Sequence, residues 1–173
     1  MIADRRSQPV IEVRPAGTAD LPAVQRIVNS AYAEFEPWLT PANWVRMTNN
    51  IAKVIEPDAP GRLRVAQLGD QLAGTVTYLP PGPKDYPQVP PEYAVIRVLA
   101  VDPALRGRGV AHALTADCLA LAREDHAPAV GLHTAEMMVA ARALYERAGF
   151  VRHHEFPHLD LRFCVYLRQV CPS

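Results

Sequence analysis

The chain has 173 residues, and its 18 basic residues balance 18 acidic ones, which gives a formal net charge of zero. This length suits one compact domain, and the charge balance predicts no field that would attract nucleic acid or an anionic membrane. No run approaches the roughly 18 uninterrupted apolar residues of a membrane span, and the charged N-terminus lacks the apolar core of a secretory signal. We therefore expect a cytoplasmic protein without nucleic-acid or membrane partners. Its three cysteines have no paired spacing and are expected to be reduced thiols: Cys118, Cys164 and Cys171.

The first half of the chain predicts a strand, two helices and a hairpin. Apolar residues recur at helical spacing after Thr18 or Asp20, either of which suits the cap position. Two strand-like runs flank Gly69-Asp70, a pair typical of tight antiparallel turns. In chain order we expect a strand at 10–14, a helix from 21 that Pro37 ends, a helix at 41–54, and strands at 63–68 and 71–79.

The second half begins with a proline-rich loop and continues into the strongest predicted strand, 93–101. That strand is nearly continuous in apolar residues, so we expect it to be central and covered on both faces. The remaining expected elements are a helix at 110–124, a strand at 130–134, a helix at 139–147 that Gly149 caps, and strands at 150–152 and 161–167 joined by a His-rich turn at 153–158. The last strand has apolar residues on both faces. It should lie inside the sheet or be covered by a second copy in a homodimer.

A glycine-rich turn, Arg106-Gly107-Arg108-Gly109-Val110-Ala111, lies between the buried strand and the following helix. Glycines let the backbone approach a ligand, and the start of a helix presents unpaired N–H groups at the positive end of its dipole. The turn therefore suits a phosphate or pyrophosphate. The alternative is a turn that only joins strand to helix, because glycine motifs this short also arise by chance.

Two familiar phosphate loops do not fit this turn. A Walker loop ends in Gly-Lys-Ser/Thr, whereas Val110-Ala111-His112 follows Gly109 here. A dinucleotide fingerprint that began at Gly107 would need a small residue in place of His112, and it would normally follow the first strand of the fold. A dinucleotide-dependent oxidoreductase is therefore not expected.

The turn resembles the central motif of the GNAT family of acyl-CoA-dependent N-acetyltransferases, Gln/Arg-x-x-Gly-x-Gly/Ala, at every specified position. Residues 99–103 look like the family's pantetheine-binding strand, and 143–150, Ala-Leu-Tyr-Glu-Arg-Ala-Gly-Phe, look like its second signature. The resemblance covers residues 10–168 and leaves short termini at 1–9 and 169–173. It implies a single α/β (α+β) domain with a mixed, mostly antiparallel central sheet flanked by helices, in the order β-α-α-β-β-β-α-β-α-β-β.

The resemblance implies direct transfer of an acetyl group from acetyl-CoA to the amine of a small molecule or peptide, in a ternary complex. The backbone of the glycine turn would hold the CoA pyrophosphate, and the strand before it would offer main-chain groups to the pantetheine arm. The residues implied are Leu99, Ala100, Val101, Arg106, Gly107, Arg108, Gly109, Val110 and Ala111. By residue type alone, the two arginines read as solvated loop residues and residues 99–101 as core.

Tyr145 occupies the position of the family's general acid, where a phenol would protonate the leaving thiolate. Without the resemblance it reads as a helix tyrosine packed on the sheet. The general base stays open between Glu92, His133, Glu136 and water, because the strand that carries a glutamate in many relatives carries Arg97 among apolar residues here. Met138 stands where many relatives have an asparagine. These departures support a second hypothesis, a catalytically weak acyl-CoA-binding or sensor protein of the same fold.

The acceptor site is expected between the first two helices and the last hairpin. Its aromatic candidates are Tyr32, Phe35 and Trp38, with Trp44 nearby, and its histidine candidates are His153, His154 and His158. A place in the core or at the rim is the alternative for the aromatic residues. The histidine spacing matches no compact ligand set, so no metal is expected. The sequence does not predict which amine is the acceptor.

Overall fold

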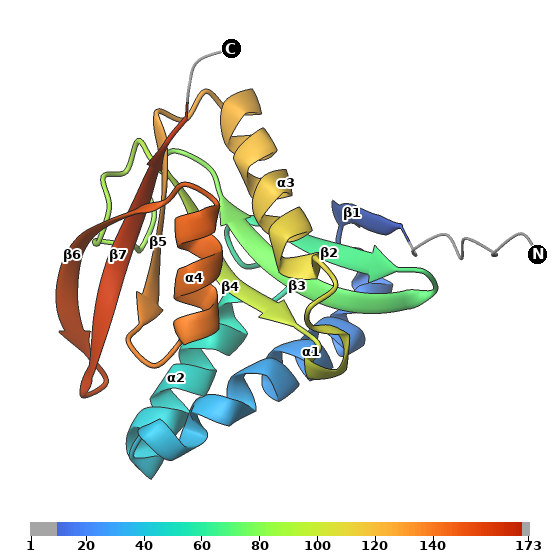
Figure 1. The fold of residues 1–173 in the computed structure, drawn as a ribbon, viewed down its shortest axis with the longest axis horizontal. Coiled ribbons are helices and arrows are strands. Elements are labelled where there is room, and N and C mark those ends of the chain that lie inside the picture. Colours follow the sequence, from blue (N-terminus) through green and yellow to red (C-terminus); the bar gives the residue numbers. More distant parts are fainter. Residues whose placement is uncertain (1–9, 171–173) are drawn as a thin grey trace, which may run out of the picture.

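The computed structural model describes residues 10–170, which fold around a seven-stranded sheet with the strand order β1-β2-β3-β4-β5-β7-β6. Strands β4 and β5 are parallel, and every other neighbouring pair is antiparallel. Figure 1 shows the sheet and its covering helices. The strands are β1 (Ile11–Pro15), β2 (Arg62–Leu68), β3 (Gln71–Leu79), β4 (Ala94–Val101), β5 (Ala129–Ala135), β6 (Val151–His158) and β7 (Leu161–Gln169).

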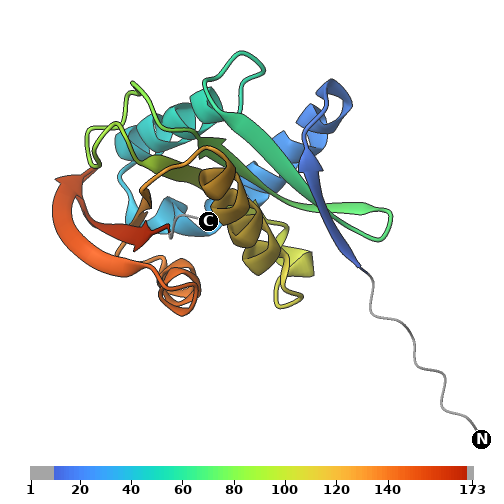
Figure 2. The same cartoon turned by 90° about the horizontal axis from the view of Figure 1, so that it is seen from above.

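Helices cover both faces of the sheet. The first face carries α3 and α4, and its core includes Leu114, Cys118 and Tyr145. The second face carries α1, which packs on β3 and β4 and buries Val24, Ile27 and Val28. Figure 2 shows the two groups of helices on opposite sides of the strands. The helices are α1 (Leu21–Tyr32), α2 (Pro41–Val54), α3 (Val110–Glu124) and α4 (Val139–Arg147), with short 3-10 turns at Thr18–Asp20, Ala33–Trp38 and Pro103–Leu105.

The mixed, mostly antiparallel sheet and the order of elements confirm the expected fold. Strand β4 is the middle strand, as its continuous apolar run predicted. The β2–β3 hairpin turns at Gly69-Asp70, and Gly149 follows α4 with a φ of 84°. Strand β7 lies between β5 and β6, so it lies inside the sheet, the first of the two places expected for it.

The prediction of a His-rich turn at 153–158 was wrong. These residues belong to β6, which pairs with β7 along its length, with a bulge between Arg152 and His154. Strand β6 is the edge of the sheet and most of its side chains are exposed, so its polar residues face solvent and break the alternation that marks a half-buried strand. The turn itself is Leu159-Asp160, with φ values of 53° and 60°.

The expected side-chain cap of α1 was also wrong. Asp20 stands at the cap position, but its carboxylate does not bond to the helix. Instead it accepts hydrogen bonds from Arg14 at 2.7 and 3.0 Å and from the Gly17 N–H at 2.7 Å. The carboxylate therefore ties the helix start to β1, and the guanidinium lowers the pKa of Asp20 to about 2.

Within residues 10–170, no helix is long and apolar enough to cross a membrane, and the cytoplasmic location stays a prediction. Cys118 and Cys164 are buried free thiols, and Cys171 lies outside the described residues. The elements run from Ile11 to Gln169. The predicted N-terminal tail 1–9 lies outside the described part of the chain.

Candidate functional site

The site lies where the two parallel strands separate. Strand β5 pairs with β4 only at Ala94–Val130 and Val95–Gly131, after which the strands diverge (Figure 1). The edge of β4 from Ile96 to Val101 that faces this opening therefore has no strand partner. An extended ligand could add to it through main-chain hydrogen bonds.

A bulge in β4 turns the strand at this opening. Thr75 pairs with Ala100 and Thr77 with Arg97, so β4 holds one residue more than β3 between these pairs. Val98 in the bulge has a φ of 51°, a conformation that costs a β-branched residue about 1–3 kcal/mol. The bulge divides the strand, since Arg97 and Val98 line a small cavity and the next three residues line a large one.

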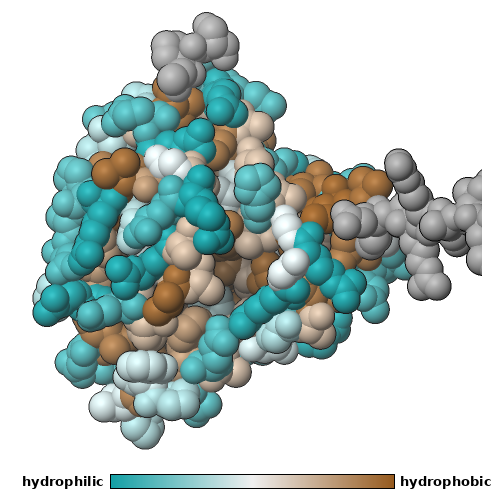
Figure 3. All heavy atoms as spheres, in the orientation of Figure 1, coloured by the Kyte–Doolittle hydropathy of each residue, from teal (hydrophilic) through white to brown (hydrophobic). Residues whose placement is uncertain are grey.

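The large cavity has a volume of about 710 Å³, within the range of about 300–1,000 Å³ that is common for ligand sites. Figure 3 shows this face of the molecule hollowed near its centre, with apolar residues in the hollow. Its walls come from α1 with the following turn, β4, the start of α3, and α4. Of the predicted residues, it brings together Tyr32, Phe35, Trp38, Leu99, Ala100, Val101, Arg106, Gly107, Gly109, Val110 and Ala111.

The glycine turn forms one end of this cavity. Gly107 and Gly109 have φ values of 75° and 86°, a left-handed conformation that favours glycine. The N–H of Ala113 donates to the Gly109 carbonyl at 3.0 Å as the first bond of α3. The N–H groups of residues 110–112 therefore have no partner within the helix, and these residues line the cavity. This end of the cavity suits an anion.

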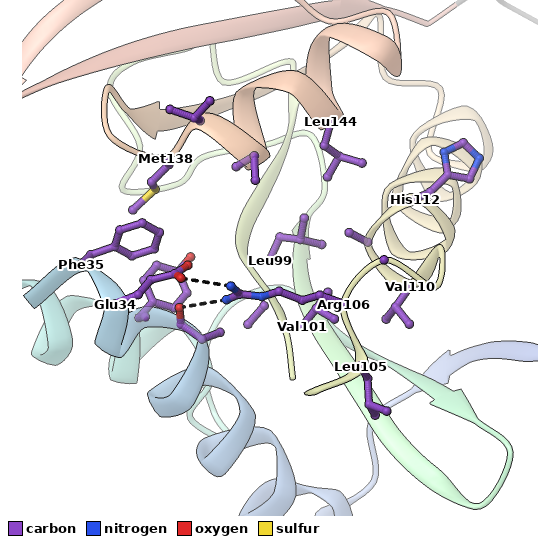
Figure 4. Close-up of a pocket in the computed structure, with 18 of the residues that line it drawn as sticks. Glu34, Phe35, Leu99, Val101, Leu105, Arg106, Val110, His112, Met138 and Leu144 are labelled. Atoms are coloured by element: carbon purple, nitrogen blue, oxygen red, sulfur yellow. Dashed lines mark hydrogen bonds and ion pairs between the residues drawn. The ribbon is translucent and has the colours of Figure 1, made fainter. Parts of the chain in front are cut away.

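The two arginines of the turn have different surroundings. Arg106 reaches across the large cavity, where its guanidinium donates to a carboxylate oxygen of Glu34 at 3.0 Å and to the Ala31 carbonyl at 3.4 Å (Figure 4). Arg108 is exposed and lines neither cavity. The expected contact of Arg108 with phosphate is the less supported of the two.

The small cavity has a volume of about 130 Å³ and lies between α2, β4, β5, α4 and the β6–β7 turn. Tyr32 and Met138 line both cavities, so the two adjoin at these side chains. The Asn43 amide of α2 donates to Asp160 in the β6–β7 turn at 2.6 Å, which holds the two outer walls together.

Tyr145 lines the small cavity and not the large one. Only 6% of the residue is exposed, and its ring packs edge-on against Phe150 with the centroids 5.7 Å apart. Within residues 10–170 its hydroxyl makes no hydrogen bond. Burial, together with the nearby Tyr32, raises the pKa of Tyr145, so the hydroxyl keeps its proton at neutral pH.

The base candidates differ in position. Glu92 and Glu136 are exposed and line neither cavity. His133 lines the small cavity, where its Nδ1 lies 2.5 Å from the Tyr86 hydroxyl and its ring stacks on that of Tyr86. Burial, followed by the charge of Arg97, lowers the pKa of His133 to about 3, so the imidazole is neutral at pH 7.

The remaining acceptor candidates are divided. His158 lines the small cavity, whereas Trp44, His153 and His154 line neither. No group of three or more metal-binding side chains comes together in the described part of the chain. Sequence reasoning missed Tyr86, which the expected proline-rich loop places in the small cavity with only 4% of its surface exposed. An aromatic residue among prolines was its only sequence signal.

Comparisons with known proteins agree with this architecture. The chain is 33% identical over 117 residues to rat N-acetyltransferase family 8 member 2, a match over 62% of this chain and half the length of that protein. The structure superposes on the ribosomal-protein-S18-alanine N-acetyltransferase of Escherichia coli with a TM-score of 0.67 and 18% identity, covering 95% of this chain and 96% of the other. It also superposes on yncA of Salmonella typhimurium, a protein solved with its cofactor acetyl-CoA, with a TM-score of 0.67 and 16% identity. This match covers 94% of this chain and 95% of the other. The Acetyltransferase (GNAT) family matches residues 21–150, and the chain belongs to this family.

Proposed function

We propose that the protein transfers an acetyl group from acetyl-CoA to the amine of a small molecule or peptide, directly within a ternary complex. The observation that carries this proposal is the pair of adjoining cavities. The large one has unpaired helix N–H groups at one end and an unpartnered strand edge along its side. The small one adjoins it at Tyr32 and Met138 and holds Tyr145. The fold shared with a protein solved with acetyl-CoA supports the same donor.

The large cavity would hold the donor. The N–H groups from Gly107 to His112 would bind the pyrophosphate, and the free edge of β4 would pair with the amide groups of the pantetheine arm. Phosphate oxygens at the turn would compete with Glu34 for the guanidinium of Arg106. We therefore expect the Arg106–Glu34 ion pair to weaken when CoA binds.

The transfer forms a bond from the amine nitrogen to the acetyl carbon and breaks the bond from that carbon to sulfur. The nitrogen loses a proton and the departing thiolate gains one. We assign the second proton to the Tyr145 hydroxyl, which burial keeps protonated. The raised pKa also makes this phenol a weaker acid, which lowers the driving force for the proton transfer.

No described side chain supplies a strong base. His133 is neutral but weakly basic, and both candidate glutamates lie outside the cavities. We propose that the acceptor binds as the neutral amine and that its nitrogen, after it attacks the acetyl carbon, loses one proton to water. Reaching the neutral form at pH 7 costs roughly 4.6 kcal/mol for a lysine-like amine and about 1.4 kcal/mol for an α-amine of pKa near 8. Weakly basic acceptors are favoured.

The test combines CoA titration calorimetry with an assay of thiol release from acetyl-CoA over a panel of amines. We expect CoA binding and amine-dependent release. Gly109→Glu should abolish binding, because it places bulk and negative charge at the pyrophosphate site. Lack of binding at millimolar CoA would refute the proposal. Binding without release for any amine would favour the second hypothesis, an acyl-CoA-binding or sensor protein, which the missing strand glutamate and Met138 support.

A further inference from the structure

Among the described residues, those that line the small cavity include one permanent cation and no acidic residue. Arg97, on β4 beside the bulge, is the only arginine or lysine among its lining residues, and no aspartate or glutamate lines it. The guanidinium carbon lies 5.6 Å from the centre of the Tyr86 ring. Because arginine stays protonated at every physiological pH, the cavity is electropositive.

Arg97 is distinctive among the arginines of residues 10–170. It has no hydrogen bond and no ion pair within this range, although it is half-buried. The other arginines there that form no side-chain hydrogen bond or ion pair are exposed at the surface: Arg26, Arg46, Arg108, Arg123 and Arg147. The half-buried Arg64, by contrast, forms two hydrogen bonds to Asp117, at 2.7 and 3.0 Å. A partly desolvated cation without a counter-ion is unfavourable, so the position calls for an anion from outside the chain.

The groups around Arg97 do not supply that anion. Burial raises the pKa of Tyr32 and Tyr86, and the charge of Arg97 opposes that effect. Burial lowers the pKa of His133, and the charge of Arg97 lowers it further. The pKa of Tyr32 still lies at about 12, and that of His133 at about 3, so both are neutral at pH 7. A second cation, Arg46, acts on His158 from α2. The positive charge of these arginines therefore disfavours polycations as ligands of the small cavity.

We propose that the acceptor carries a carboxylate beside its amine, as amino acids do, and that Arg97 binds this carboxylate in the small cavity. The planar guanidinium matches a carboxylate in geometry and balances its single charge. A phosphate monoester carries about −1.5 to −2 at pH 7 and would leave charge uncompensated beside one arginine. The volume of about 130 Å³ admits a small group only.

This assignment rests on the proposed acetyl transfer. The positive charge of Arg97 favours an acceptor that brings a carboxylate to it. The same charge would repel diamines and aminoglycosides. Arg97 thus serves to select the acceptor and to position it.

The test compares each amino acid with the amine that lacks only its carboxylate: L-leucine with isoamylamine and L-phenylalanine with phenethylamine, with putrescine as a dication. We expect kcat/KM for the amino acid to exceed that of its partner by roughly 10- to 100-fold, the range for a hydrogen bond to a charged group. Arg97→Gln should remove this preference and Arg97→Lys should retain part of it. Arg123→Gln, a change at an exposed arginine outside both cavities, should leave it intact.

Calorimetry on the CoA complex separates this inference from the proposed function. Binding of L-leucine or L-phenylalanine that Arg97→Gln weakens supports the inference even if no product forms, and in that case only the proposed transfer fails. Three outcomes would overturn the inference about Arg97: equal or tighter binding of the decarboxylated amines, preference for putrescine, or no binding of either amino acid. Efficient acetylation of amines without a carboxylate would leave the transfer proposal standing.

Discussion

Tyr145 and His133 face the same small cavity, and burial fixes the protonation state of both. Removal from water disfavours the charged form of each group, so it raises the pKa of the phenol and lowers that of the imidazole. At pH 7 the cavity therefore contains a protonated phenol and a neutral imidazole. This combination suits proton donation by Tyr145 better than proton removal by His133.

Tyr145→Phe tests the proposed acid because it removes the hydroxyl and keeps the ring against Phe150. General-acid catalysis contributes roughly 100-fold or more, so kcat should fall by about that factor where chemistry limits turnover. The Kd for acetyl-CoA should stay the same, since Tyr145 does not line the large cavity. Unchanged kcat on a good acceptor would make Tyr145 a packing residue, and a parallel loss of CoA affinity and thermal stability would make it structural.

Because the pKa of His133 is lowered in the folded protein, we expect the protein to lose stability in acid. An unfolded histidine binds a proton below pH 6.5, whereas folded His133 resists protonation down to about pH 3. Between these values the unfolded state binds more protons, so the free energy of unfolding falls by up to about 1.4 kcal/mol per pH unit as the pH drops. Urea denaturation between pH 7 and pH 4.5 should show a shallower decline for His133→Phe. His153→Phe, at an exposed position, should decline like the wild type, and identical slopes for all three proteins would contradict the prediction.

At the scale of elements, the turn before α3 is where we propose that the anionic part of CoA binds. Gly107 and Gly69 are a matched pair, with φ values of 75° and 61° and no atom within 4 Å of an added Cβ. Alanine at either position should cost about 1–2 kcal/mol through the left-handed conformation. Only Gly107 lines the large cavity, so only Gly107→Ala should also weaken CoA binding. Calorimetric titration and urea denaturation of both variants check this, and equal CoA affinities would place the phosphates elsewhere.

At the scale of the whole molecule, the large cavity is lined by β4 and by three helices, α1, α3 and α4. Helix α1 covers one face of the sheet, and α3 and α4 cover the other. A ligand that binds only the folded chain at about 100 times its Kd adds about 2.7 kcal/mol to stability. For a chain of this size that corresponds to a rise in Tm of roughly 5–11 °C. Thermal denaturation with and without CoA measures the shift, with Gly109→Glu as the control that should show none. A wild-type Tm that saturating CoA does not change would contradict this expectation.

The position of β7 also bears on assembly. Its residues 163–166 are buried within this chain, and its two edges pair with β5 and β6. A second copy is therefore not needed to explain the pattern of residues 161–167. The homodimer stays a prediction, which sedimentation at high micromolar concentration would test.

Local patterns in the sequence were enough for most of the fold. The expected helix at 139–147, with Gly149 as its cap, matches α4 to the residue, and a continuous apolar run identified β4 as central. The glycine turn predicted an anion site because the backbone conformation of glycine and the start of a helix both depend on local sequence. Strand β6 was missed where its side chains face solvent, since an edge strand leaves little hydrophobic alternation to read.

The division of the site into two cavities was decided by tertiary structure. It depends on where β4 stops pairing with β5, and these strands come from distant parts of the chain. That separation placed Tyr86, Arg97 and Tyr145 around one small cavity and left Glu92 and Glu136 outside. The sequence by itself determined which residues could do chemistry, because residue type and local conformation are written along the chain. Only the packing of remote segments decided which of them meet, because burial and opposing charges arise between elements.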